Sequence, residues 1–294
     1  LCSKNRSELR TDNTDTLLEG NYLPRSDTMK TDMKTADSSS RDTALPARAE
    51  HGIAAFVTGT DTEIGKTFIA SALLARARLR GLTTLGLKPV ASDCFENHNG
   101  LVNADALSLQ AQCEPEADYE SINPWRFAPA IAPHIAARQV GVNLEVAKIA
   151  AHVRGQQTSA PRDLLLVEGA GGWRVPLNDD EDFSDLAIEL GLPVILVVGL
   201  RLGCINHARL TLEAIERDGL EIAGYVINHL EADIEVSEDN MATLSRTLRA
   251  PCLGVVPWMC DEDLSNTRHA AERAASYLQL PCGLESRSVH VVQE

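Results

Sequence analysis

The sequence contains Gly59-Thr-Asp-Thr-Glu-Ile-Gly65-Lys66-Thr67, which has the composition of a phosphate-binding loop. It lies between a short apolar run at 53–58, typical of a strand, and a helical pattern at 66–80. In such a loop, backbone N–H groups and the start of the helix surround phosphate oxygens. The Lys66 ammonium would reach the β- and γ-phosphates, and the Thr67 hydroxyl would ligate Mg²⁺. The stretch therefore predicts a nucleotide-binding site, without indicating which reaction it serves.

The loop differs from the usual pattern in its spacing and its charge. Five residues separate Gly59 from Gly65 instead of four, so Thr60 stands where the first glycine belongs. Asp61 and Glu63 would repel a polyphosphate unless they point away or meet a cation. We expect one of them to face a metal ion or a positively charged substrate. The alternative is that both are solvated turn residues.

Short apolar runs alternate with amphipathic helical patterns from residue 52 onward. This alternation is typical of a parallel sheet covered by helices on both faces. We therefore predict an α/β fold of the P-loop nucleoside triphosphate hydrolase type, with a mostly parallel sheet. Right-handed crossovers would bring the carboxyl ends of the strands to one edge, where ligands bind. Further strands are expected at 83–90, 163–167, 193–198, 222–227 and 252–256, and further helices at 144–154, 183–190, 206–218 and 241–248.

The first 50 residues differ in composition from the rest of the chain. They are rich in Ser, Thr, Asp, Lys and Arg and too poor in apolar residues to offset the entropy of ordering, so we expect a disordered extension at 1–50. The segment has neither the apolar core of a secretory signal nor the acid-poor composition of a transit peptide. Because Met29 and Met33 lie within it, a native start inside the segment stays open. A P-loop domain at 51–276 and a C-terminal tail at 277–294 complete the expected organisation.

Composition restricts the classes of partner. A net charge of −15 argues against a nucleic-acid-binding surface, which needs a basic patch. The longest apolar run, 192–200, is far shorter than the roughly 20 residues of a membrane-spanning helix. We therefore expect no nucleic-acid partner and no membrane partner. The seven cysteines include no C-x-x-C pair, which fits buried thiols in a reducing cytoplasm and predicts a cytoplasmic protein.

Four polar residues stand at the ends of expected strands or at a helix start. Lys88 could neutralise phosphate or carboxylate charge, or could simply be solvated. Glu168 follows a wholly apolar strand and precedes Gly-Ala-Gly-Gly, which suggests a Mg²⁺ ligand of the Walker-B type. Asp105 opens a helix, where aspartate is favoured without any ligand. Asn228 could bind the edge of a base, and a turn asparagine is an equal alternative.

Seven blocks follow one another in unbroken order between residues 56 and 258. They are TGTDTEIGKT (58–67), KPVAS (88–92), NADAL (103–107), NPWRF (123–127), LVEGAGGW (166–173), LGCINHA (202–208) and PW (257–258). Together these blocks resemble the dethiobiotin synthetase family. The extra residue in the phosphate loop is part of that family's pattern.

The resemblance implies an ATP-dependent cyclo-ligase of biotin biosynthesis, at the penultimate step of that pathway. Its substrates would be 7,8-diaminononanoate, CO₂ or bicarbonate, and ATP. CO₂ would add to one amine to form a carbamate, and ATP would phosphorylate the carbamate. The second amine would attack this carbamic–phosphoric anhydride, giving dethiobiotin, ADP and phosphate. The resemblance also implies Mg²⁺ as cofactor and a homodimer.

The family's site residues are carried over by position in this sequence. The catalytic group would be Lys66, Lys88, Glu63 and Ser92, with Ser92 near the carbamate. Mg²⁺ would be held by Thr67, Asp105 and Glu168. ATP would contact the loop residues Thr62, Glu63, Ile64, Gly65, Lys66 and Thr67, and its adenine would contact Asn228, Pro257 and Trp258. The substrate would contact Ser92 and, across the dimer interface, Leu202, Gly203, Cys204, Ile205 and Asn206, where a helix start favours an anion.

Other P-loop classes fit the sequence less well. Regulatory switch ATPases of the partitioning or septum-placement type carry an extra lysine in the loop, and residues 60–64 contain none. Cobyrinate-type amide synthases need a glutaminase domain, for which the fewer than forty residues after Trp258 leave too little room. An inactive relative kept as a binding module stays open, although the residues with chemical roles are retained.

Overall fold

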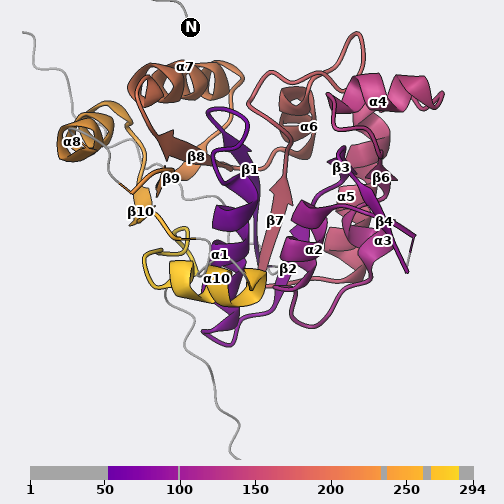
Figure 1. Cartoon of the computed structure of the whole chain (residues 1–294), viewed down its shortest axis with the longest axis horizontal. Helices are drawn as coiled ribbons and strands as arrows, with labels where there is room; N and C mark the ends of the chain where they lie inside the picture. Colours follow the sequence, from indigo (N-terminus) through magenta and orange to yellow (C-terminus); the bar gives the residue numbers. More distant parts are fainter. Residues whose placement is uncertain (1–51, 99, 233–236, 261–265, 285–294) are drawn as a thin grey trace, which may run out of the picture. The chain divides into compact units, whose positions relative to one another are not determined.

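The computed structural model describes residues 52–98, 100–232, 237–260 and 266–284 (Figure 1). The predicted extension at 1–50 and residues 285–294 of the predicted tail lie outside the described residues. Within the described part, the main sheet has the strand order β10-β9-β8-β1-β7-β2, and every neighbouring pair is parallel. The predicted P-loop α/β fold with a parallel sheet is therefore confirmed. The strands are β1 (Ile53–Gly59), β2 (Thr84–Leu87), β7 (Leu164–Glu168), β8 (Val194–Leu200), β9 (Ile222–His229) and β10 (Cys252–Val256).

The strands at the centre of the sheet are apolar without alternation because helices cover both of their faces. All residues of β7 and of β8 are buried. In β1, Ala55 and Val57 point to a core shared with α1 (Lys66–Arg78), whereas Phe56 between them packs into the core on the opposite face. The strand order places β1, and the loop that follows it, in the interior of the sheet, between β8 and β7.

Helices form a layer on each face of the sheet. Beside α1, the first layer contains α2 (Ala104–Gln110) and α10 (Thr267–Ala275), both in contact with α1 (Figure 1). The second layer contributes apolar residues to the cores on the other face. Its helices are α5 (Val146–Ser159), α6 (Phe183–Leu190), α7 (Cys204–Arg217) and α8 (Ser237–Thr247), which correspond to the four helices predicted after residue 140.

The single strand predicted at 83–90 is wrong, because the chain leaves the main sheet at Lys88. Strand β2 ends at Leu87, and β3 (Val90–Ala91) pairs instead with β6 (Trp125–Arg126). Pro89 interrupts the ladder because proline has no backbone N–H to donate. Three short elements that the sequence did not predict surround this excursion: the hairpin of β4 (Phe95–Asn97) with β5 (Gly100–Val102), α3 (Tyr119–Ile122) and α4 (Pro133–Gln139).

The described residues after α10 pack against the domain. Residues 277–284 belong to the segment expected as a tail, and three of their leucines, Leu278, Leu280 and Leu284, are buried in the core beneath α1. Leu278 also forms a β-bridge with Gly254 in β10. No helix within the described residues is long and apolar enough to cross a membrane.

Candidate functional site

The phosphate loop connects the carboxyl end of β1 to the start of α1. At its beginning, the Thr60 N–H donates to Val197 O of β8 at 3.0 Å. At its end, Lys66 Nζ donates to Asp61 O at 2.9 Å, so the lysine side chain folds back over the loop. Glu63 and Gly65 have left-handed backbone conformations, with φ of 58° and 82°. The loop thus encloses the space in front of the N-terminus of α1, as expected for a phosphate site.

Asn228, near the end of β9, hydrogen-bonds the backbone of the loop. It is buried, and its Nδ2 donates to Ile64 O at 3.0 Å. The approach is so close that a Cβ at position 65 would lie 2.4 Å from this nitrogen. Gly65 is therefore required both by its positive φ and by its contact with Asn228. Ile64 itself is buried and packs its side chain against Gly199 of β8.

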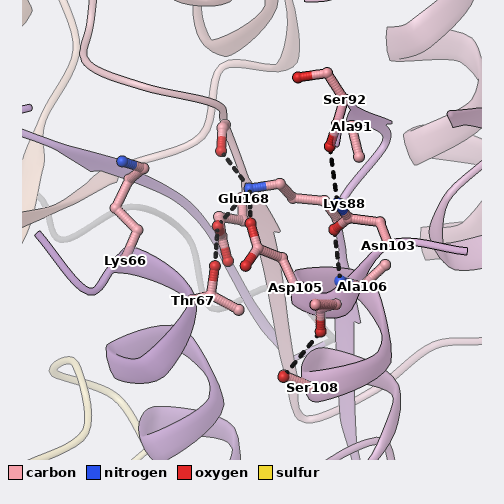
Figure 2. Close-up of polar contacts among 12 residues, drawn as sticks. Lys66, Thr67, Lys88, Ala91, Ser92, Asn103, Asp105, Ala106, Ser108 and Glu168 are labelled. Carbon is pink, nitrogen blue, oxygen red and sulfur yellow. Dashed lines mark hydrogen bonds and ion pairs between the residues drawn. The ribbon is translucent and has the colours of Figure 1, made fainter. Parts of the chain in front are cut away.

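Lys88 lies at the centre of the polar side chains beside the loop (Figure 2). Its Nζ donates to Glu168 Oε1 at 2.6 Å and to Gly169 O at 3.1 Å, and it lies 3.1 Å from Asp105 Oδ2. The Thr67 hydroxyl donates to the same Glu168 oxygen at 2.7 Å. The residue that follows β2, the last residue of β7, and residues of α1 and α2 thus converge at one point, because the strands end at the same edge of the sheet.

The two lysines of the site differ in their electrostatic environment. Burial and the neighbouring Lys88 ammonium lower the pKa of Lys66 to about 8. Lys88 is also buried, but the Glu168 and Asp105 carboxylates outweigh the burial and hold its pKa above the usual value. Asp105 is affected reciprocally: although burial opposes it, the Lys88 ammonium holds the pKa of Asp105 below its usual range.

The oxygen atoms around Lys88 fit a magnesium ion. Glu168 is 1% exposed, and its Oε2 has no hydrogen-bond partner among the residues that the structure describes. A buried, unpartnered carboxylate oxygen is costly unless a cation neutralises it. Mg²⁺ binds through one or two carboxylates together with phosphate oxygens and water, and the Thr67 hydroxyl and Asp105 carboxylate complete such a set.

A cleft of about 640 Å³ opens over the loop and the Lys88 cluster. Phe68, Ser71, Asn103 and Ser108 line it as well, and none of them was predicted as a site residue. Ser92 and Glu63 both face the cleft, and among the described residues Glu63 has no ion-pair partner. The predicted residues that line the cleft are Thr62, Glu63, Gly65, Lys66, Thr67, Lys88, Ser92, Asp105 and Glu168.

The structure keeps other predicted residues outside the lining of this cleft. Trp258 follows β10 and is 44% exposed, whereas the Leu202 side chain is fully exposed between β8 and α7. Helix α7 begins at Cys204, whose thiol is buried. Within the described part of the chain, the predicted residues that do not line the cleft are Ile64, Asn228, Pro257, Trp258, Leu202, Gly203, Cys204, Ile205 and Asn206.

Arg201 was not predicted, yet it forms the ion pair that explains an acidic residue in the phosphate loop. Its guanidinium donates to Asp61 Oδ2. Asp61 is therefore met by an arginine of the protein itself, and Glu63 is the loop carboxylate to which the expected metal ion or charged substrate still applies. The only signal in the sequence is that Arg201 directly follows the apolar run ending at Leu200.

Comparisons with known proteins identify the family. A family model described as an AAA domain matches residues 54–267. Among solved structures, the MinC:MinD cell division protein complex of Aquifex aeolicus aligns over 76% of this chain and 93% of its own, at 14% identity and a TM-score of 0.49. The ATP-dependent dethiobiotin synthetase BioD of Chromohalobacter salexigens is 56% identical over 234 residues, which are 77% of this chain and 97% of the relative. The chain belongs to the dethiobiotin synthetase family.

A second dethiobiotin synthetase, that of Cellvibrio japonicus, is 53% identical and covers 76% of this chain and 95% of its own length. The resemblance predicted from the seven sequence blocks is thereby confirmed. This dethiobiotin synthetase family member is an enzyme, an ATP-dependent ligase of biotin biosynthesis, and its P-loop binds the nucleotide.

Proposed function

We propose that the enzyme converts 7,8-diaminononanoate, CO₂ and ATP to dethiobiotin, ADP and phosphate in the cytoplasm. One observation carries the proposal: two lysines, Lys66 and Lys88, and the oxygens of Thr67, Asp105 and Glu168 meet at a single cleft. Such a site brings positive charge to a nucleotide phosphate and to an anionic second substrate at the same place.

The reaction begins when one neutral amine of the diamine adds through its nitrogen to the carbon of CO₂ and releases a proton to solvent, which forms a carbamate. The carbamate oxygen then attacks the γ-phosphorus of ATP, and ADP leaves. The neighbouring amine attacks the carbonyl carbon of the mixed anhydride, the C–O bond to phosphate breaks, and the amine loses its proton. ATP thus replaces a poor leaving group, oxide, by a good one, phosphate, and the protein contributes position and charge.

The two lysines have separate roles. Lys66 lies over the loop and would contact the β- and γ-phosphates, exchanging its bond to Asp61 O for the phosphate oxygens. Lys88 would stabilise the charge of the carbamate and of the transferring phosphoryl group. Ser92, which lines the same cleft, would hydrogen-bond the carbamate, and Glu63 would face the metal and the amines.

Thr67, Asp105 and Glu168 would hold Mg²⁺. When bound, the ion neutralises charge on the β- and γ-phosphate oxygens. The unpartnered Oε2 of Glu168 supports this assignment. The remaining loop residues, Thr62, Ile64 and Gly65, would contribute backbone contacts to the phosphates.

Contacts outside the cleft complete the proposal. Asn228 gives its Nδ2 to the loop, which leaves Oδ1 as an acceptor for the adenine, beside Pro257 and Trp258. In a homodimer, the segment 202–206 at the start of α7 would bind the substrate carboxylate of the partner subunit. Backbone N–H groups at a helix start stabilise an anion, which supports this role.

The direct test is product formation. Purified protein is incubated with 7,8-diaminononanoate, bicarbonate, Mg²⁺ and ATP, and dethiobiotin is sought by mass spectrometry, with each component omitted in turn. We expect product only when all four are present, and none with Lys66→Ala or Lys88→Ala. Lys148→Ala, an exposed lysine of α5, is the matched control and should retain activity. ATP hydrolysis that ignores the diamine and yields no cyclic urea would contradict the proposal.

A further inference from the structure

The Asp61 carboxylate lies in a phosphate-binding loop, where its negative charge would repel the phosphates of a nucleotide. Its Oδ1 accepts the Thr62 N–H at 2.8 Å, its Oδ2 accepts from Arg201, and its backbone oxygen accepts from Lys66. Asp61 therefore joins three parts of the site: the turn of the loop, the phosphate lysine and the residue that follows β8. A carboxylate in this position organises the loop but repels a triphosphate unless its charge is neutralised.

Arg201 supplies the neutralising charge from a fixed position. It directly follows β8, whose Val197 accepts the Thr60 N–H, and its own backbone oxygen accepts the Cys204 N–H at 3.0 Å as α7 begins. The backbone before and at Arg201 is thus held by hydrogen bonds, and the guanidinium reaches Asp61 from there. Neither Arg201 nor Asp61 is among the described residues that line the cleft.

Stability is a poor explanation for this pair. The side chains of Arg201 and Asp61 are 42% and 41% exposed, and pairs at that exposure contribute little to folding. The effect of these two charges on nucleotide binding is larger than their effect on folding, because the triphosphate carries several negative charges and each of them interacts with the pair.

From these contacts we propose that Arg201 is a positioning residue for nucleotide binding, acting through Asp61. It holds the Asp61 carboxylate in the orientation that shapes the loop, and it cancels the repulsion between this carboxylate and the phosphates. The proposal rests on ATP binding at the loop, which is part of the proposed function. It adds a residue that the carried-over family positions do not include.

Nucleotide affinity of the full chain tests the proposal without relying on turnover. ATP and ADP are titrated into the protein with Mg²⁺ in a calorimeter, without diamine. Arg201→Gln leaves Asp61 unpaired, and we expect ATP to bind roughly three- to tenfold more weakly, with a smaller loss for ADP because it carries less charge. The difference should shrink at high salt, which screens exposed charges.

The second variant separates charge from shape. In Asp61→Asn/Arg201→Gln the repulsive charge is gone, and the asparagine oxygen still accepts the Thr62 N–H, so ATP affinity should return to within about twofold of the wild type. Arg201→Lys keeps the cation and should remain close to the wild type. Arg154→Gln removes a similarly exposed arginine, which pairs with Glu189 and does not line the cleft. This control variant should leave the ATP affinity unchanged.

Each outcome has a definite meaning. An Arg201→Gln affinity equal to that of the wild type would overturn the proposal. A double variant as weak as Arg201→Gln would also overturn it, because Arg201 would then contact the nucleotide directly or hold the fold, and the melting temperature distinguishes these two. If the wild type binds ATP but makes no dethiobiotin, the proposed function fails while the role of Arg201 stands.

Discussion

At the scale of single residues, Lys88 is the charge on which the site depends. It is the only cation bonded to Glu168 among the described residues, and Glu168 is almost completely buried. Nucleotide phosphates would compete with the Glu168 and Asp105 carboxylates for Lys88, and Mg²⁺ would compete with Lys88 for these carboxylates. Lys88 can therefore leave the carboxylates only when another cation replaces it. A buried carboxylate without any partner would cost several kcal/mol.

Lys88→Met tests this charge balance through stability. In EDTA we expect the free energy of unfolding to fall by about 3–5 kcal/mol, because the buried Glu168 loses its cationic partner and keeps only the hydrogen bond from the Thr67 hydroxyl. Excess Mg²⁺ should restore part of this loss by binding the orphaned oxygens. Urea denaturation with and without Mg²⁺ measures both effects. Lys66→Met is the control, since Lys66 donates to a backbone oxygen, and equal losses for both variants would contradict the argument.

Gly65 offers a second test, based on space. An alanine there must adopt a positive φ and place its Cβ 2.4 Å from Asn228 Nδ2. We expect Gly65→Ala to weaken ATP binding roughly tenfold or more, because the loop must move away from Asn228. Gly141→Ala also has a positive φ, but no atom lies within 4 Å of its new Cβ. Calorimetric titration of ATP compares the two, and equal affinities would show that the close approach is unimportant.

At the scale of elements, local pattern predicted the strands and helices better than their ends. Continuous apolar runs identified β7 and β8 because both faces of these strands are buried. The run 83–90 has the pattern of one strand because the apolar character continues into β3 after Pro89. Pairing of β3 with β6 joins residues 35 apart in sequence, and no local pattern reveals such a partner.

The segment after α10 is a structural element whose role can be measured. Leu278 is 1% exposed and packs beneath α1, whereas the adjacent Tyr277 is 46% exposed. We expect Leu278→Ala to lower the free energy of unfolding by about 2–5 kcal/mol, because it leaves a cavity in the core. Tyr277→Ala should cost less than about 1 kcal/mol. Urea denaturation of the two variants decides, and similar losses would mean that the segment is not part of the folded core.

At the scale of the whole molecule, the sequence predicted the part of the site whose polar residues directly follow apolar strands. Lys88, Glu168 and the loop stood out in the sequence because each follows an apolar strand, and the parallel sheet brings such positions together. The ion pair of Arg201 with Asp61 could not be predicted, because it joins side chains 140 residues apart. Its existence depends on the order of the strands, in which β8 lies directly beside β1.

The boundaries of the working unit give the last prediction. The family model begins at residue 54, and the Chromohalobacter salexigens relative aligns over 97% of its own length with only 77% of this chain. We therefore expect a variant lacking residues 1–51 to form dethiobiotin with kcat and KM within about twofold of the full chain, since every residue that the family model matches is retained. Removal of 277–294 is the contrasting variant, because it deletes three buried leucines, and it should lower the melting temperature clearly. Product formation and thermal melting of both variants test the prediction. Loss of activity in the first variant, with its melting temperature unchanged, would show that the N-terminal segment takes part in catalysis.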